Sequence, residues 1–178
     1  MKVSLEQLVA LDFEASCLPA KGRFSFPIEA GIAFVVSGAS HTWLIKPLPT
    51  WLEQGTWDPA SERVYDISLA QLDGEGLPAE RVAAELAQAL QGKTAVSDAA
   101  DYDRSWAAVL FGAAGKVPFP VVDFELAIGQ ILGPLGRKEQ AAWLAAEALA
   151  LKRFPARHRA GADARRLAEV LRLLAQIG

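Results

Sequence analysis

Two acidic residues end an apolar segment close to the N-terminus, in the stretch LVALDFEAS that covers residues 8–16. The apolar residues predict a buried strand, and alternate side chains of a strand share one face. Asp12 and Glu14 are therefore expected on the same face as Leu8 and Ala10, beyond its apolar part. Carboxylates near a core are costly unless they are compensated, and ligands of α/β sheets gather beyond the carboxyl ends of strands. A bound cation would explain both acids, whereas a solvated strand end is the simpler alternative for so short a pattern.

A second group of acids occurs in SDAADYDRSWAAVLF, residues 97–111, where a helix is expected from Asp101 to Ala113. The residues three, four, seven and eight positions after Asp103 are all apolar, so this side chain is expected on the buried face of the helix. Asp101 has more polar neighbours at the same spacing, which suits a residue at the positive N-terminal end of a helix. Asp98 follows a predicted short strand and is expected to serve as a turn or cap residue. Only Asp103 is therefore predicted to point inward.

The third group is HRAGAD, residues 158–163, at the start of a C-terminal helix with an apolar stripe. Asp163 lies on this stripe, although an acid placed at a helix start by the helix dipole has the same pattern. His158 precedes Asp163 by five residues, about 140° apart on a continuous helix, so a shared face requires a loop. Gly161 favours such a loop. His158 is then a candidate base, whereas a lone histidine is more commonly a surface residue.

The four acids predicted to face inward come from three segments of the chain: Asp12, Glu14, Asp103 and Asp163. They would repel one another unless cations neutralise them, and carboxylate oxygens are the ligands that Mg²⁺ and Mn²⁺ prefer. Zinc is not favoured, because the one cysteine and the two histidines show no zinc-ligand spacing. Two hard ions about 4 Å apart activate a water molecule and stabilise the leaving oxygen of a phosphodiester. A histidine would remove the proton of that water, and His158 is the candidate.

The stretches LDFEAS, PIEAGIAF, SDAADYD and HRAGAD, in this order, resemble the motifs of the DEDDh 3′–5′ exonucleases. That family includes ribonuclease T and the proofreading exonucleases of DNA polymerases, and it has a ribonuclease H-like fold. The resemblance extends from residue 8 to about residue 170. It implies that the four acids bind two Mg²⁺ or Mn²⁺ ions, that His158 is the general base, and that the main chain of Ala15 and Ser16 lies beside the terminal sugar. It also implies release of 5′-mononucleotides from the 3′ ends of single-stranded DNA or RNA.

The sequence departs from the family pattern at two places. Many members have a His-Asn pair ahead of the second motif, where this chain has Asp98 and Ala99. A histidine is often found ahead of the Ile-Ser pair at residues 67–68, where this chain has Tyr65 and Asp66. The change at Asp98 and Ala99 bears on substrate affinity and preference more than on metal binding.

The order of predicted elements indicates an α/β fold in a single domain that covers residues 1–178. Three strands joined by hairpins are expected first, at residues 8–15, 27–36 and 41–47, followed by an irregular segment at 48–68. Helices are expected at 78–91 and 101–113, strands at 94–98 and 119–124, and helical patterns continue to residue 177. This order indicates a ribonuclease H-like mixed sheet, with three antiparallel N-terminal strands plus parallel strands, flanked by helices.

The composition suits a globular domain, since 52% of the 178 residues are hydrophobic. No stretch approaches the ~20 apolar residues of a membrane span, so no membrane partner is expected. The first residues lack the apolar core of a signal peptide. The single cysteine, Cys17, excludes an internal disulfide, which suits a cytoplasmic protein.

Charge is distributed unevenly along the chain, whose net value is −3. From Arg137 onward nine Lys and Arg stand against four Asp and Glu, a balance of +5, whereas the first 136 residues carry nine bases and seventeen acids, or −8. The basic third is expected to be a solvated helix surface, a contact for nucleic acid, or the face of a homodimer.

Three other functions are compatible with parts of the sequence. The same fold with a weakened site would be a nucleic-acid-binding or scaffold module, which metal-stimulated turnover would separate from the enzyme. An aspartate-nucleophile phosphatase requires a second aspartate where Glu14 stands. A hydrolase that uses Cys17 and His158 would be inactivated by an alkylating agent.

Four of the five tryptophans fall into two groups of interest. Trp106 and Trp143 lie within apolar helical patterns and are expected in the core. Trp51 and Trp57 lie in the segment predicted to be irregular, where exposure would let them stack on nucleic-acid bases.

Overall fold

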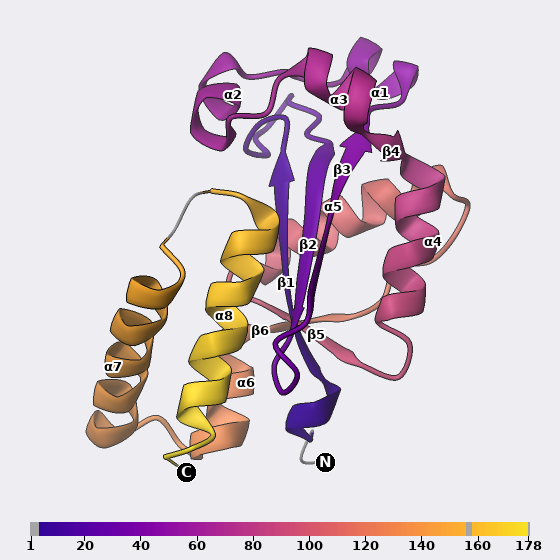
Figure 1. Cartoon of the computed structure of the whole chain (residues 1–178). Helices are drawn as coiled ribbons and strands as arrows, with labels where there is room; N and C mark the ends of the chain where they lie inside the picture. The colour runs from indigo at the N-terminus through magenta and orange to yellow at the C-terminus, as the bar shows by residue number, and fades with distance from the viewer. Residues whose placement is uncertain (1–3, 156–157, 178) are drawn as a thin grey trace.

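The computed structural model describes residues 4–155 and 158–177, which form a six-stranded sheet with helices on both faces (Figure 1). The strands are β1 (Leu8–Ala15), β2 (Pro27–Phe34), β3 (Ser40–Lys46), β4 (Leu77–Pro78), β5 (Thr94–Ser97) and β6 (Val121–Asp123). The helices are η1 (Leu5–Gln7, a 3₁₀ turn), α1 (Pro49–Gln54), α2 (Pro59–Tyr65), α3 (Leu69–Glu75), α4 (Ala79–Ala89), α5 (Ala100–Ala113), α6 (Phe124–Leu132), α7 (Arg137–Arg153) and α8 (Ala160–Leu174). Within the described part of the chain, no helix combines the length and apolarity needed to cross a membrane.

The sheet is mixed, in the order β4-β3-β2-β1-β5-β6. β1, β2 and β3 are consecutive antiparallel neighbours, and β5 and β6 continue the sheet parallel to β1. β4 adds a short parallel edge beside β3. The predicted arrangement of three antiparallel strands plus parallel strands is confirmed, and the fold is ribonuclease H-like.

Alternate residues of β1 contribute to two hydrophobic cores, one on each face of the sheet. Val9 and Leu11 belong to the core that contains residues of α4 and α5, whereas Leu8 belongs to the core with α6 and α8. α7 packs along α8 as an outer layer (Figure 1). Because of the same alternation, Asp12 and Glu14 emerge on the face that α8 covers.

Two glycines let the first turn of α8 lie directly on the sheet. A Cβ on Gly31 of β2 would overlap the backbone of Ala160, and a Cβ on Gly161 would overlap the side chain of Thr42 in β3. Gly31 is also the partner of Asp12 in the register of β1 and β2. The interpretation of Gly161 as a loop residue was wrong, because α8 begins at Ala160 and the glycine serves close packing instead.

The segment predicted to be irregular, residues 48–68, instead contains α1 and α2 and leads into α3. Pro49 and Pro59 begin the first two helices, and Asp58 and Ser68 cap α2 and α3 through their side chains. Helices of six or seven residues show too little of an apolar stripe for periodicity to reveal them, which is why this prediction failed.

Packing also changes the expected environment of three tryptophans. Trp51 is buried and stacks on Phe26 with ring centroids 5.9 Å apart, so its predicted exposure was wrong. Trp57 is half-buried and keeps part of its surface exposed. Trp106 lies in the core, as predicted. Trp143 is only partly buried.

Candidate active site

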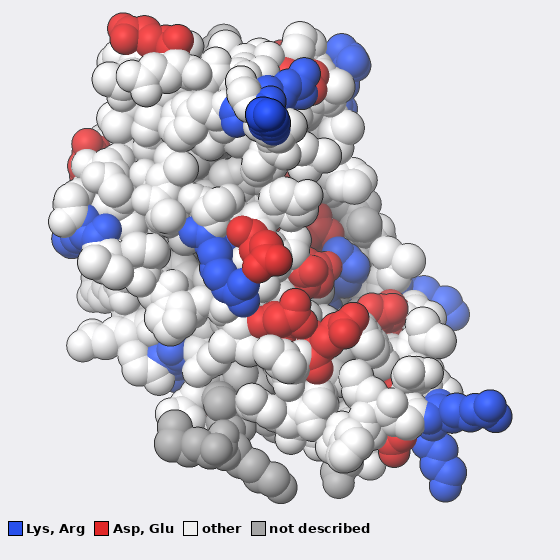
Figure 2. Space-filling view, turned by 180° about the vertical axis from the view of Figure 1, so that it is seen from behind, with Lys and Arg blue, Asp and Glu red and all other residues white. Residues whose placement is uncertain are grey.

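Three carboxylates converge where β1 ends beside the first turn of α8. One oxygen each of Asp12, Glu14 and Asp163 lies within 4.8 Å of the others, a spacing at which they could hold a metal ion. Glu14 and Asp163 are buried, and Asp12 is partly exposed. Figure 2 shows acidic side chains gathered near the middle of one face of the molecule, with basic side chains beside them. The structure thus brings three of the four predicted ligands together.

Asp103, the fourth predicted ligand, approaches the same end of the sheet from α5 and is fully buried. Its Oδ2 accepts a hydrogen bond from the hydroxyl of Ser97 at the end of β5. Within the described residues, its Oδ1 has no hydrogen-bond partner. A buried carboxylate oxygen without a partner is costly, so this oxygen is available to a ligand that the described protein groups do not supply.

Burial and mutual repulsion favour the protonated forms of Asp12, Glu14 and Asp103. Burial, followed by the charge of Asp103, raises the pKa of Asp12 well above its usual value. Burial, followed by the charge of Asp163, raises the pKa of Glu14 to about 8. Burial also raises the pKa of Asp103 to about 7, although the hydrogen bond from Ser97 opposes the shift. A bound cation would favour the charged forms and displace these protons.

Asp163 differs from the other three acids because an arginine accompanies it. Its Oδ1 accepts from the Arg166 guanidinium at 3.1 Å, and its Oδ2 accepts from the backbone N–H of Arg159 at 3.1 Å. Arg166 also lines a small cavity of about 120 Å³ together with Asp98 and Asp123. The α8 side of the cluster therefore already carries one positive charge.

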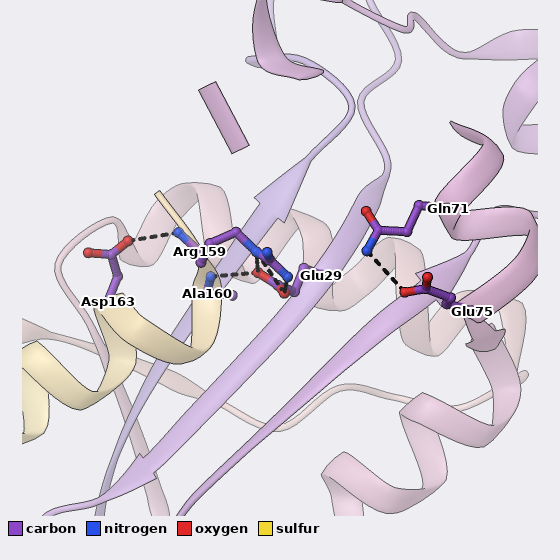
Figure 3. Close-up of polar contacts among 6 residues, drawn as sticks. All are labelled: Glu29, Gln71, Glu75, Arg159, Ala160 and Asp163. Atoms are coloured by element: carbon purple, nitrogen blue, oxygen red, sulfur yellow. Dashed lines mark hydrogen bonds and ion pairs between the residues drawn. The ribbon is translucent and has the colours of Figure 1, made fainter. Parts of the chain in front are cut away.

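Glu29 lies opposite Glu14 in the register of β1 and β2 and is fully buried. The Arg159 guanidinium donates to both of its carboxylate oxygens at 2.6–3.1 Å, and the Ala160 N–H donates to one of them at 2.8 Å (Figure 3). These contacts fasten the chain that enters α8 to β2. Sequence analysis did not single out Glu29 or Arg159, and the available signal was an acid inside a strand predicted to be apolar.

His158 lies on the connection immediately before this ion pair. Its side chain is exposed, and its backbone is left-handed with a φ of 48°, which is uncommon for a residue other than glycine. The non-helical chain predicted between His158 and Asp163 is present, but it ends at Arg159. Since Glu29 binds Arg159 and Ala160, it restricts where the histidine can be placed.

The chain that follows β1 is enclosed by the protein. Ala15, Ser16 and Cys17 are all buried. The Ser16 N–H donates to the carbonyl of Phe26, and the Ser16 carbonyl accepts another internal hydrogen bond. Cys17 is buried whereas His158 is exposed, and the described residues show no hydrogen bond between the two that would suit a Cys–His hydrolase.

Two positions that depart from the family pattern lie near the acids. Burial, followed by the charge of Glu14, raises the pKa of Tyr65, which places this phenol within the electrostatic reach of the cluster. Asp98 follows β5 and lines the small cavity beside Arg166. Both side chains therefore lie close to residues of the acid cluster.

No protein-family model matches the sequence, and no curated protein is found to be similar to it. Solved structures are similar in fold. The nuclease domain of 3′hExo, a DEDDh family member bound to rAMP, has a TM-score of 0.72 and 13% identity over 96% of this chain and 92% of that chain. The Mg²⁺- and Mn²⁺-bound form of S. pombe Pop2p has a TM-score of 0.60 and 17% identity over 92% and 81% of the two chains.

E. coli Exonuclease I in complex with a dT13 oligonucleotide has a TM-score of 0.55 and 14% identity over 72% of this chain. The match spans only 30% of the Exonuclease I chain. The chain thus has the fold of the DEDDh 3′–5′ exonucleases, as the motif resemblance implied.

The residues of the cluster fit hard divalent cations. All of the converging ligand atoms are carboxylate oxygens, and the buried oxygen of Asp103 has no partner among the described residues. Mg²⁺ and Mn²⁺ are bound by such oxygens, and several negative charges in one place are tolerated when a dication lies among them.

Proposed function

We propose that this chain is a metal-dependent 3′–5′ exonuclease that hydrolyses the terminal phosphodiester bond of single-stranded DNA or RNA and releases 5′-nucleoside monophosphates. One observation supports it above all others: ligand oxygens of Asp12, Glu14 and Asp163 lie within 4.8 Å of one another. Asp103 adds a buried oxygen that has no hydrogen-bond partner among the described residues. The fold shared with a complex of Exonuclease I and dT13 supports the choice of substrate.

The proposed ligands are the four acids predicted from the sequence: Asp12, Glu14, Asp103 and Asp163. Two bound Mg²⁺ or Mn²⁺ ions would supply an activated water and charge stabilisation at the leaving oxygen. The carboxylates must release their protons to become metal ligands. Because the pKa values of Glu14 and Asp103 are raised, metal binding is expected to depend on pH. The four side chains lie on β1, α5 and α8, which hold them in place without substrate.

In this proposal His158 accepts the proton of the attacking water. An imidazole nitrogen can accept a proton from water and pass it on, which is the usual task of a histidine general base. The side chain is exposed, so it is accessible to a bound nucleic-acid strand. The ion pair between Glu29 and Arg159 limits the positions that His158 can adopt.

The test uses 5′-labelled single-stranded DNA and RNA, incubated with Mg²⁺, with Mn²⁺ or with a chelator. We expect a ladder that shortens from the 3′ end and disappears with the chelator and with Asp12→Asn. Asp101→Asn is the matched control, because Asp101 lies on α5, is almost fully exposed and pairs with Arg104 outside the cluster. Undiminished cleavage by Asp12→Asn would show that the acid cluster is not the catalytic centre.

A second candidate function is a nucleic-acid-binding module of the same fold. The contact between Arg166 and Asp163 favours it, since an acid that already has an arginine partner needs a metal ion less. Oligonucleotide binding without cleavage in either metal would support this second candidate.

A further inference from the structure

A pocket on the other flank of α8 gathers three of the arginines that make the C-terminal third basic. It has a volume of about 440 Å³ and lies between the end of β2, the β2–β3 turn, the end of α7 and α8. Its charged and aromatic lining residues are Arg153, Arg165, Arg172, Glu169, Phe34 and Phe154. This volume is in the range of sites that bind small molecules. We refer to it as the arginine pocket.

Helix geometry separates the arginine pocket from the acid cluster. Arg165, Glu169 and Arg172 follow Asp163 by two, six and nine residues, which turns their side chains ~180–240° away from it around α8. These three residues form one stripe, spaced by four and then three residues. α8 therefore carries the acid cluster on one flank and the arginine pocket on the other.

Glu169 orders two of the guanidinium groups. This buried carboxylate accepts from Arg153 at 3.0 Å and from Arg172 at 2.6 and 2.8 Å. The bonds use Nη1 of Arg153 and Nε and Nη2 of Arg172, so each guanidinium keeps further N–H donors for a ligand. Arg165 is exposed, and no ion pair joins it to any residue in the described ranges. Three arginines against one glutamate give the pocket an excess of positive charge.

Phe154 adds aromatic surface to this charge. It is only partly buried, and the Arg153 guanidinium lies 5.5 Å from its ring centroid. The Phe34 ring packs on the other face of the sheet, beside His41 and Lys93, so Phe34 contributes only its main chain to the pocket. Guanidinium donors match the oxygens of a phosphate, and aromatic rings stack on nucleic-acid bases. A ligand that combines a phosphate with a flat base would use both features of the pocket.

We propose that the arginine pocket is a second, non-catalytic site that binds a nucleotide phosphate, with the base against Phe154. The same chemistry can come from a free nucleoside 5′-phosphate or from one unit of a longer strand. This site goes beyond the proposed hydrolysis. It gives a role to arginines that contact neither the acid cluster nor Glu29.

The test measures binding to the full chain in chelator, so that neither metal nor turnover contributes. Adenosine 5′-monophosphate, inorganic phosphate and single-stranded oligothymidylates of increasing length are titrated by calorimetry, and amide NMR shifts locate the ligand. Loss of one charge-assisted contact in Arg165→Ala should weaken binding about tenfold. Arg137→Ala is the matched control, because Arg137 is an exposed residue at the other end of α7 and does not line the pocket. Thermal unfolding checks that both variants are folded.

We expect shifts at Gly38 and Phe154, with unchanged affinity in Arg137→Ala. Binding of the mononucleotide supports a free nucleotide as the ligand, whereas affinity that appears only with oligothymidylates and grows with length supports a strand unit. Four results would each overturn the proposal. The first two are equal affinity for inorganic phosphate and the mononucleotide, and equal loss of affinity in Arg165→Ala and Arg137→Ala. The others are NMR shifts confined to Asp12 and Asp163, and binding of an acidic peptide in place of any nucleotide. Because no hydrolysis is measured, a failed exonuclease assay would leave this result standing.

Discussion

The buried carboxylates of this protein fall into two regions that differ in how their charge is balanced. Glu29 and Glu169 each accept hydrogen bonds from an arginine guanidinium at 2.6 Å. In the described ranges, Asp12, Glu14 and Asp103 take part in no ion pair. A hydrogen bond from Arg172 lowers the pKa of Glu169, whereas burial raises the pKa of Glu14 to about 8.

This difference teaches how one residue type serves two purposes in the same fold. An acid with an arginine partner is satisfied by the protein and stabilises a contact between elements. An acid buried among other acids stays protonated or acquires a cation from outside. Asp163 is intermediate, because it belongs to the cluster and also contacts Arg166.

The largest loss of cleavage is expected when an acid without an arginine partner is replaced. Asp103→Asn keeps an oxygen that can accept from Ser97 but removes a ligand charge. Cleavage should fall by more than the roughly 100-fold that loss of an outer-shell partner of a metal site costs. Initial rates of 3′-end trimming with saturating Mn²⁺ measure this loss, with Asp101→Asn as control. A variant within a few-fold of the unmodified protein would remove Asp103 from the site.

An acid with an arginine partner should respond mainly in stability. Glu29→Gln leaves the Arg159 guanidinium facing an uncharged group, and breaking such a pair costs about 3 kcal/mol of unfolding free energy. Urea denaturation measures this change. Turnover should also fall at unchanged KM and unchanged Mn²⁺ affinity, because the connection that carries His158 is loosened while the acids are intact.

The double variant Glu29→Leu/Arg159→Met separates the two roles of this ion pair. Replacing both partners by apolar residues should restore much of the stability. It should not restore turnover if the pair positions His158. Full recovery of turnover together with stability would show that the pair is structural only.

The two regions should also differ in the effect of pH on stability. The folded-state pKa of Glu14 is about 8 and that of Asp103 about 7, so the metal-free folded protein holds protons that the unfolded chain has released. The stability that these protons supply is complete below the unfolded pKa of about 4 and is lost as the pH rises through about 7 to 8. Chemical denaturation in chelator across this range measures the loss. Saturating Mg²⁺ should reverse it, and a flat profile would contradict the assigned shifts.

The smallest effect is expected on Mn²⁺ affinity when the arginine partner of Asp163 is removed. Arg166→Met removes the internal cation beside Asp163, so Mn²⁺ should bind a few-fold more tightly in calorimetric titration. Weaker Mn²⁺ binding would instead mean that Arg166 holds Asp163 in its ligand position. Arg165→Met, which changes the same charge on the opposite flank of α8, is the control.

Local patterns were sufficient to predict most of the sheet and the four candidate ligands. The alternation in β1 places Asp12 and Glu14 on one face, and the helical spacing around Asp103 turns it inward. Such predictions succeed because a strand or helix with one buried face repeats its apolar residues at its own period. The short helices α1 and α2 offer no such repeat, and they were missed.

Which acids face inward, and in which order the elements follow, can be read from residues a few positions apart in the chain. Which acids receive a cation from the protein depends on how distant elements pack. Glu29 and Arg159 are 130 residues apart in the chain, and they meet because Gly31 and Gly161 let α8 lie on β2 and β3. Whether a buried carboxylate is satisfied depends on such distant contacts, because the partner that neutralises it is chosen by the packing of whole elements.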